Sequence, residues 1–170
     1  MITLAREPAP MQTSGDRLQR RICFVCTGNT CRSPMAAAVA NALAAESEEP
    51  SVVAVSAGLC ACNGAPISPN ALLALEEAGV PPVPGLDYRA HHARPLTEQE
   101  AEACDLLIPL TREHGLSLLL SYPQFASRIL PFPRQVADPF GGDMETYRRC
   151  LAEITEGVRE LLLRKEEDGR

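Results

Sequence analysis

Short apolar runs alternate with segments of helical periodicity along most of the chain. Three runs, at residues 21–26, 51–56 and 104–110, are rich in apolar and β-branched residues, and a weaker run lies at 128–130. Continuous apolar runs of this length are typical of strands that are buried on both faces of a sheet. The pattern therefore predicts four strands.

Segments with helical signals separate these runs and follow the last of them. A Ser-Pro pair begins two predicted helices, at 33–34 and 68–69, because proline is tolerated in the first turn of a helix. Residues 97–100 carry a capping-box pattern for a short helix. The predicted caps of two later helices are Thr111 and Asp143. The last helix has an apolar stripe of Tyr147, Leu151, Ile154, Val158, Leu161 and Leu162.

Strands that alternate with helices favour a parallel sheet, because each parallel connection needs a crossover that places a helix on one face. We predict an α/β fold, with three α/β/α layers around a four-stranded parallel sheet, in one domain over residues 21–166. Residues 1–20 show no sustained periodicity and are predicted to form a flexible N-terminal extension. Ligands of such sheets bind beyond the carboxyl ends of the strands. The loop after the first strand is therefore where we expect a site.

The composition narrows the classes of function. The length of 170 residues suits one domain, and the net charge of −6 argues against nucleic-acid binding through a basic surface. No apolar run approaches the roughly 20 residues of a membrane-spanning helix, and no apolar signal segment precedes the first strand. We expect a cytoplasmic monomer without membrane attachment. The seven cysteines, an odd number, are expected to be reduced thiols.

The loop after the first strand carries the candidate chemistry, and residues 26–34 read Cys-Thr-Gly-Asn-Thr-Cys-Arg-Ser-Pro. Backbone N–H groups around Gly28 and the N-terminus of the next helix are expected to form an anion-binding site. Arg32 adds planar, bidentate donors that suit phosphate oxygens, and Ser33 places a hydroxyl near Cys26. A positive field of this kind favours the thiolate of Cys26, which is the nucleophilic form of cysteine.

Two other interpretations apply to Cys26. Cysteine is among the most buried residue types, so this residue alone also fits the end of a core strand. Cys23 and Cys26, together with Cys60 and Cys62, have spacings that suggest a zinc site. The first pair lies on a predicted strand, however, whereas the ligands of a zinc knuckle are separated by a turn. We therefore expect no metal site.

A family resemblance is carried by the segment Phe24-Val-Cys-Thr-Gly-Asn-Thr-Cys-Arg-Ser-Pro-Met35. It resembles the phosphate-binding loop of the low-molecular-weight protein tyrosine phosphatases. The resemblance continues in Ser56-Ala-Gly58, His91-His-Ala-Arg94, Asp105-Leu-Leu and Asp138-Pro139, and covers residues 21–165.

The resemblance implies a ping-pong phosphoryl transfer from phosphorylated proteins, without a cofactor. Cys26 would attack phosphorus to form a phosphocysteine, while Arg32 and the loop amides hold the phosphate oxygens. Asp138 would protonate the leaving group and then activate water, although taken alone it also fits a turn residue before Pro139. An opposing protein kinase is implied by the resemblance only.

The resemblance also assigns supporting roles. The members of the phosphate-binding loop are Thr27, Gly28, Asn29, Thr30, Cys31 and Ser33. Asn29, Ser56 and His91 match positions that brace this loop by hydrogen bonds. His91 and His92 fit two solvated loop histidines equally well. His114 has no motif around it and is predicted to lie on a helix surface.

Two positions bear on the substrate. Family members that act on phosphotyrosine usually carry a bulky apolar residue at the position of Thr30, whereas the branch that resembles protein-arginine phosphatases carries threonine. A threonine hydroxyl offers a polar contact to water or a guanidinium, and such contacts discriminate strongly between substrates. Phe140 is predicted to form an apolar wall of the cleft, or else to belong to the core. We expect phosphoarginine to be the substrate, with phosphotyrosine as the alternative.

The remaining cysteines bear on redox chemistry. The resemblance supports a reversible disulfide between Cys26 and Cys31 that protects the nucleophile from over-oxidation. Arsenate reductases of this architecture need further closely spaced cysteines, whereas here Cys104 is followed only by the distant Cys150. An inactive phosphoprotein-binding module is disfavoured, because the candidate nucleophile, arginine and acid are all present.

Overall fold

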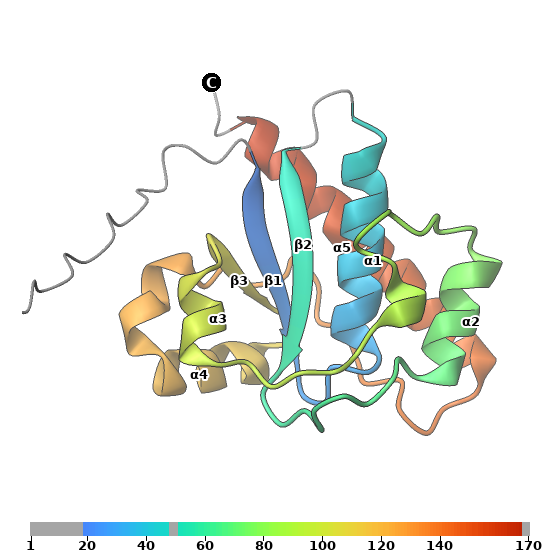
Figure 1. The fold of residues 1–170 in the computed structure, drawn as a ribbon, viewed down its shortest axis with the longest axis horizontal. Helices are drawn as coiled ribbons and strands as arrows, with labels where there is room; N and C mark the ends of the chain where they lie inside the picture. The colour runs from blue at the N-terminus through green and yellow to red at the C-terminus, as the bar shows by residue number, and fades with distance from the viewer. Residues whose placement is uncertain (1–18, 48–50, 168–170) are drawn as a thin grey trace, which may run out of the picture.

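The computed structural model describes residues 19–47 and 51–167 (Figure 1). In chain order the elements are β1 (Arg20–Cys26), α1 (Arg32–Ala45), β2 (Val52–Gly58), α2 (Pro69–Glu77), the 3-10 helix η2 (Tyr88–Ala90), α3 (Glu98–Glu102), β3 (Leu106–Pro109), α4 (Arg112–Ser121), the 3-10 helix η3 (Pro123–Arg128) and α5 (Met144–Glu167). The predicted extension at 1–20 lies outside the described residues except for Gln19 and Arg20, and Arg20 begins β1.

The described strands form a parallel sheet in the order β2-β1-β3. β1 is the central strand, and its pairing with β2 places Cys26 beside Gly58 at the carboxyl ends. On the other side, Val25 is paired with Pro109 of β3. The loop that follows β1 therefore starts at the middle of the sheet edge where ligands of parallel sheets bind.

The prediction of a fourth strand at 128–130 is wrong. Ile129 forms one isolated parallel bridge with Leu107, and the Leu130 N–H donates to Leu107 O at 2.9 Å. Phe132 N–H donates to Pro109 O at 3.1 Å, but proline has no N–H with which to return a bond. The ladder ends there, and the described sheet has three strands.

Helices cover both faces of the sheet, which gives the three layers that the sequence predicts (Figure 1). Ile22 and Phe24 of β1 belong to the apolar cluster formed with α1, α2 and α5. Cys23 and Val25 point to the opposite face and belong to the cluster formed with α3, α4 and η3. This alternation follows from the two-residue period of side chains along a strand. It also separates Cys23 from Cys26, so these two thiols do not form a pair of metal ligands.

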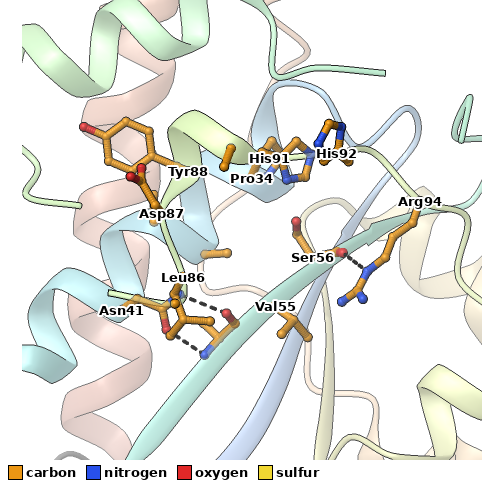
Figure 2. A pocket seen from close by; sticks show the side chains of 15 residues that line it. Pro34, Asn41, Val55, Ser56, Leu86, Asp87, Tyr88, His91, His92 and Arg94 are labelled. Atoms are coloured by element: carbon orange, nitrogen blue, oxygen red, sulfur yellow. Dashed lines mark hydrogen bonds between the residues drawn. The ribbon is translucent and has the colours of Figure 1, made fainter. Parts of the chain in front are cut away.

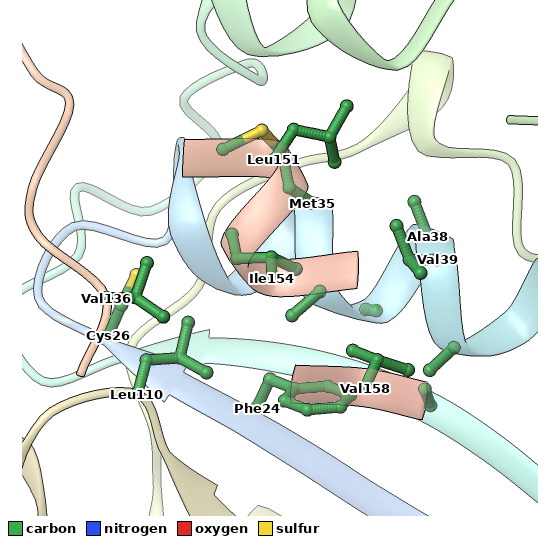
Figure 3. Packing of buried hydrophobic residues seen from close by; sticks show 14 of the residues in the cluster. Phe24, Cys26, Met35, Ala38, Val39, Leu110, Val136, Leu151, Ile154 and Val158 are labelled. Carbon is green, nitrogen blue, oxygen red and sulfur yellow. The ribbon is translucent and has the colours of Figure 1, made fainter. Parts of the chain in front are cut away.

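Helix α1 is buried around most of its circumference, and residues 32–42 are all buried. Seven of its fourteen residues are alanines, so the neighbouring elements can approach closely. Met35 packs in the same cluster as Ile154 and Val158 of α5 (Figure 3). A helix without a polar face is stable only inside a protein core. The N-terminus of α1, which ends the candidate loop, is therefore held by the core itself.

The predicted caps are confirmed. Thr97 and Glu100 form a capping box, and Thr111 Oγ1 accepts a hydrogen bond from the His114 N–H at 3.2 Å. Asp143 accepts one from the Thr146 N–H at 2.9 Å, and the hydrogen bonds from Thr146 lower the pKa of the Asp143 carboxyl. No helix in the described part of the chain has the length and apolar character that a bilayer-spanning segment needs.

Candidate active site

The loop between β1 and α1 places a thiol at the edge of the sheet. Cys26 is the last residue of β1 and is 2% exposed. Its Sγ lies 2.9 Å from Ser33 Oγ, in the first turn of α1. The N-terminus of α1 adds positive potential at this point. The predicted neighbourhood of thiol, serine hydroxyl and helix N-terminus is thus present.

Arg32 and Asp138 meet beside this loop. The Arg32 side chain is 7% exposed, and its Nη2 lies 3.5 Å from Asp138 Oδ2. Nη1 donates to Val136 O at 3.3 Å, which fixes the guanidinium against the segment that carries the acid. The Asp138 side chain is 55% exposed, and its Oδ1 accepts a hydrogen bond from the Phe140 N–H at 3.2 Å. The candidate acid therefore lies at the solvent side of the candidate anion site.

Asn29 is the central brace of the loop. Its backbone has a positive φ of 56°, a conformation that asparagine tolerates better than most residues. Its Nδ2 donates to Ser33 Oγ at 2.8 Å and to Ser56 Oγ at 2.9 Å. Its Oδ1 accepts from the Arg94 N–H at 2.9 Å. The fully buried amide thus ties the loop to α1, to β2 and to the segment before α3.

His91, which lies before α3 like Arg94, also supports the loop. Its Nε2–H donates to Asn29 O at 2.7 Å. Burial lowers the pKa of this imidazole, while the hydrogen bond to Asn29 acts in the opposite direction. His91 also lines a cavity of about 400 Å³ behind the loop, together with Ser56 and Arg94 (Figure 2). The alternative of two solvated histidines holds for His92, which is exposed, and not for His91.

The second half of the loop is held by other contacts. Thr30 O accepts a hydrogen bond from the Ser68 N–H at 2.8 Å. Cys31 is buried as a free thiol, and its Sγ lies 3.5 Å from Tyr147 Oη. Its disulfide with Cys26 stays a prediction. Phe140 is 79% exposed, so it does not belong to the core.

His114 is a site residue that the sequence reading missed. The prediction of a helix-surface position is wrong, because the residue is 6% exposed and its Nε2 lies 3.0 Å from Thr27 Oγ1. A signal was present: His114 precedes Leu118 by one helical turn, and both are the buried residues of α4. Residues four apart share one face of a helix.

Gly58 has no side chain that would collide with the loop after β1, and the substitution Gly58→Ala tests the importance of this. An added Cβ would lie 2.6 Å from Thr27 O, 2.9 Å from Ala61 Cβ and 3.1 Å from Asn29 Cβ. We expect overpacking to lower the free energy of unfolding by about 1–3 kcal/mol and the displaced loop to lower kcat/KM by about tenfold or more. Thermal unfolding measures the first effect, and steady-state kinetics measure the second. In the control Gly115→Ala, the new Cβ comes no closer than 3.5 Å to Pro109; equal stability of the two variants would contradict the prediction.

The fold and the loop define an α/β protein that holds a thiol and an arginine at a candidate anion-binding loop. Comparisons with known proteins identify the family to which the chain belongs. The family described as low molecular weight phosphotyrosine protein phosphatase matches residues 21–169. The chain belongs to this family of phosphatases, whose substrates are phosphoproteins.

The names of the individual relatives state different activities. The chain is 33% identical to a protein-arginine-phosphatase of Bacillus subtilis, over 88% of this chain and 99% of the relative. It is 32% identical to the low molecular weight protein-tyrosine-phosphatase PtpB of Staphylococcus haemolyticus, over 79% and 91% of the two chains. A crystal structure of a YwlE mutant from Bacillus subtilis superposes with a TM-score of 0.78 at 31% identity, covering 87% of this chain and 99% of that one.

Proposed function

We propose that this phosphatase removes phosphate from phosphoarginine in proteins through a phosphocysteine intermediate. The observation that carries the mechanism is the contact between Arg32 and Asp138 at 3.5 Å beside the loop that holds the Cys26 thiol. We infer that the Cys26 thiol, the Arg32 guanidinium and the Asp138 carboxyl act on one phosphate group as nucleophile, oxyanion clamp and proton donor, the three roles that phosphoryl transfer requires.

In the first step the Cys26 thiolate attacks phosphorus and the bond from phosphorus to the leaving nitrogen breaks. Asp138, in its acid form, gives its proton to that nitrogen, and the freed arginine side chain leaves. Arg32 and the loop amides hold the phosphate oxygens throughout. Ser33 Oγ, 2.9 Å from Sγ, stabilises the thiolate as attacking and later as leaving group.

In the second step a water molecule attacks the phosphocysteine. The Asp138 carboxylate takes a proton from this water, the S–P bond breaks, and inorganic phosphate is released with the Cys26 thiolate restored. A structure of YwlE arginine phosphatase that carries a phosphorylated active-site serine resembles this chain with a TM-score of 0.77 and 32% identity. This likeness supports a covalent phosphoenzyme here.

Thr30 supports the choice of phosphoarginine. Its carbonyl accepts a hydrogen bond from the Ser68 N–H, which fixes the backbone from which the side chain projects. A hydroxyl at that place offers a hydrogen bond to a guanidinium or to water, whereas a branched apolar side chain would pack better against a phenyl ring. Two relatives at 33% identity are named protein-arginine-phosphatases. Phosphotyrosine is the second candidate, supported by the description of the family and by the relative PtpB.

A thiol-coupled arsenate reductase is a weaker candidate, although a glutaredoxin arsenate reductase is 27% identical over 84% of this chain. A relay of disulfides needs neighbouring thiols. Cys104 packs on the α3 and α4 side of the sheet, whereas Cys150 packs on the α1 and α5 side. These two cysteines therefore do not form a relay.

The test of the substrate is kcat/KM for phosphoarginine and phosphotyrosine peptides of the same sequence. We expect a clear preference for phosphoarginine, and we expect Thr30→Ile to shift the ratio toward phosphotyrosine by about tenfold or more. Thr30→Val is the matched variant, because it removes only the hydroxyl and keeps the shape. Equal efficiencies in the wild type, or a preference for phosphotyrosine, would overturn the assignment to phosphoarginine.

A further inference from the structure

We propose that His114 is a positioning residue of the phosphate-binding loop: its Nε2–H holds the hydroxyl of Thr27 and so fixes the residue that follows the nucleophile. The inference rests on the proposed function for its catalytic consequence, and on the geometry of the loop for the contact itself. His114 belongs to α4 and contacts Thr27, the first loop residue after Cys26, whereas His91 contacts Asn29 in the middle of the loop.

The imidazole of His114 is held in one place. Its backbone N–H donates to Thr111 Oγ1 at 3.2 Å, within the first turn of α4. The ring is buried beside Leu118, and Nε2 lies 3.0 Å from Thr27 Oγ1. Because burial and the capped helix already order the ring, the contact with Thr27 costs little further side-chain entropy when it forms. It therefore suits a positioning role.

The second ring nitrogen decides the tautomer. Nδ1 is buried and has no hydrogen-bond partner within residues 19–47 and 51–167. A neutral imidazole has one N–H and one lone pair, and a buried N–H without a partner is rarer than an acceptor without one. The proton therefore belongs on Nε2, where it has an acceptor in Thr27 Oγ1. The hydrogen bond runs from the histidine to the threonine.

The surroundings of the ring favour its neutral form, chiefly because the ring is buried. Burial lowers the pKa of His114 from its ordinary value, and the charge of Arg32 lowers it further. The carboxylates of Glu113 and Asp138 act in the opposite direction. A neutral ring adds no charge to the anion site. Its contribution is the position of Thr27.

Thr27 is held from two directions. Its carbonyl accepts a hydrogen bond from the Cys60 N–H at 2.9 Å, from the segment after β2. Its hydroxyl meets His114 on α4. The side chain is exposed, so packing does not fix it. Without His114 the first loop residue after Cys26 would be tied to the β2 side alone, and its N–H would be less well placed for a phosphate oxygen.

The test combines two variants and one matched control. His114→Ala removes the contact, and Thr27→Val removes its acceptor. His114→Gln keeps an N–H donor near the position of Nε2. His92→Gln makes the same change at an exposed histidine. The measurements are the affinity for inorganic phosphate and kcat/KM with the better of the two phosphopeptides, with thermal unfolding as the check that each variant is folded.

We expect His114→Ala and Thr27→Val each to weaken phosphate binding and kcat/KM by about fivefold to tenfold, the effect of one hydrogen bond. The double variant is expected to lose no more than either single variant, because both remove the same bond. His114→Gln is expected to recover most of the loss, and His92→Gln to behave as the wild type. Losses that multiply in the double variant, or a folded His114→Gln as poor as His114→Ala, would overturn the proposal.

A direct measurement covers the case in which the alanine variant does not fold. The nitrogen shifts of the histidine rings, recorded by NMR on the wild type, report the tautomer of His114. We expect the proton on Nε2; a proton on Nδ1 or on both nitrogens overturns the inference. The two proposals can fail separately. If the wild type hydrolyses neither phosphopeptide but these variants still bind inorganic phosphate less tightly than the wild type does, the positioning role is supported and the proposed function is rejected.

Discussion

Replacing Cys26 with serine is expected to abolish turnover and to leave the fold intact. The proposed mechanism has no second nucleophile, and removal of a catalytic nucleophile costs about 10⁴-fold or more in kcat. Serine is close in size to cysteine, and its hydroxyl can keep the contact that Cys26 Sγ makes with Ser33 Oγ at 2.9 Å. The measurement is kcat on phosphopeptides together with the thermal unfolding temperature.

The matched control is Cys62→Ser, because Cys62 is a free and exposed thiol. We expect this variant to keep the activity of the wild type. The affinity of Cys26→Ser for inorganic phosphate is expected to stay measurable, since Arg32 and the loop amides are unchanged. Residual turnover of Cys26→Ser within tenfold of the wild type would show that another group attacks phosphorus.

Replacing Asp138 with asparagine is expected to lower kcat by about 10²–10⁴-fold, the usual contribution of a general acid or base. The loss depends on the leaving group. A phosphoarginine nitrogen needs a proton to leave, whereas an activated aryl phosphate leaves as a stable anion. We therefore expect a large loss on peptides and a much smaller loss on an aryl phosphate in the phosphorylation step.

The same change removes the contact with Arg32, but stability is expected to change little, because a half-exposed ion pair contributes about 0–1 kcal/mol. Asp87→Asn is the control. Asp87 is an aspartate paired with Arg89 at 2.7 Å outside the loop, and asparagine keeps its capping ability. Equal losses of Asp138→Asn on both kinds of leaving group would contradict a role in proton transfer.

The parts of the fold that the sequence predicted correctly depend on local signals. The apolar run of β1 ends at a turn sequence, and Thr97, Thr111 and Asp143 cap helices as their spacing indicates. A cap is satisfied by atoms within three residues, so no knowledge of the rest of the molecule is needed. The loop between β1 and α1 belongs to the same class of local signal.

The errors concern contacts between distant segments. The prediction of a fourth strand is wrong because Pro109 of β3 has no N–H to donate to the segment at 128–132. Which residue of that segment faces Pro109 depends on the pairing register, and hydrophobic periodicity does not give the register. His114 was placed on the surface because no motif surrounds it. Its partner Thr27 is 87 residues away in the chain. Such a pair is found only once α4 is known to lie beside the loop.

Because α1 is buried, we expect the candidate site to unfold only when the whole domain unfolds. Its first turn carries Arg32 and Ser33, and its next two turns are enclosed by the sheet and by α5. A surface helix frays from its ends at little cost, whereas residues 32–42 of this helix, which begin at the site, are all buried. We therefore expect partial unfolding that spares the core to spare the candidate anion site as well. Heat or denaturant should remove activity and structure in a single cooperative event, without a folded and inactive species in between.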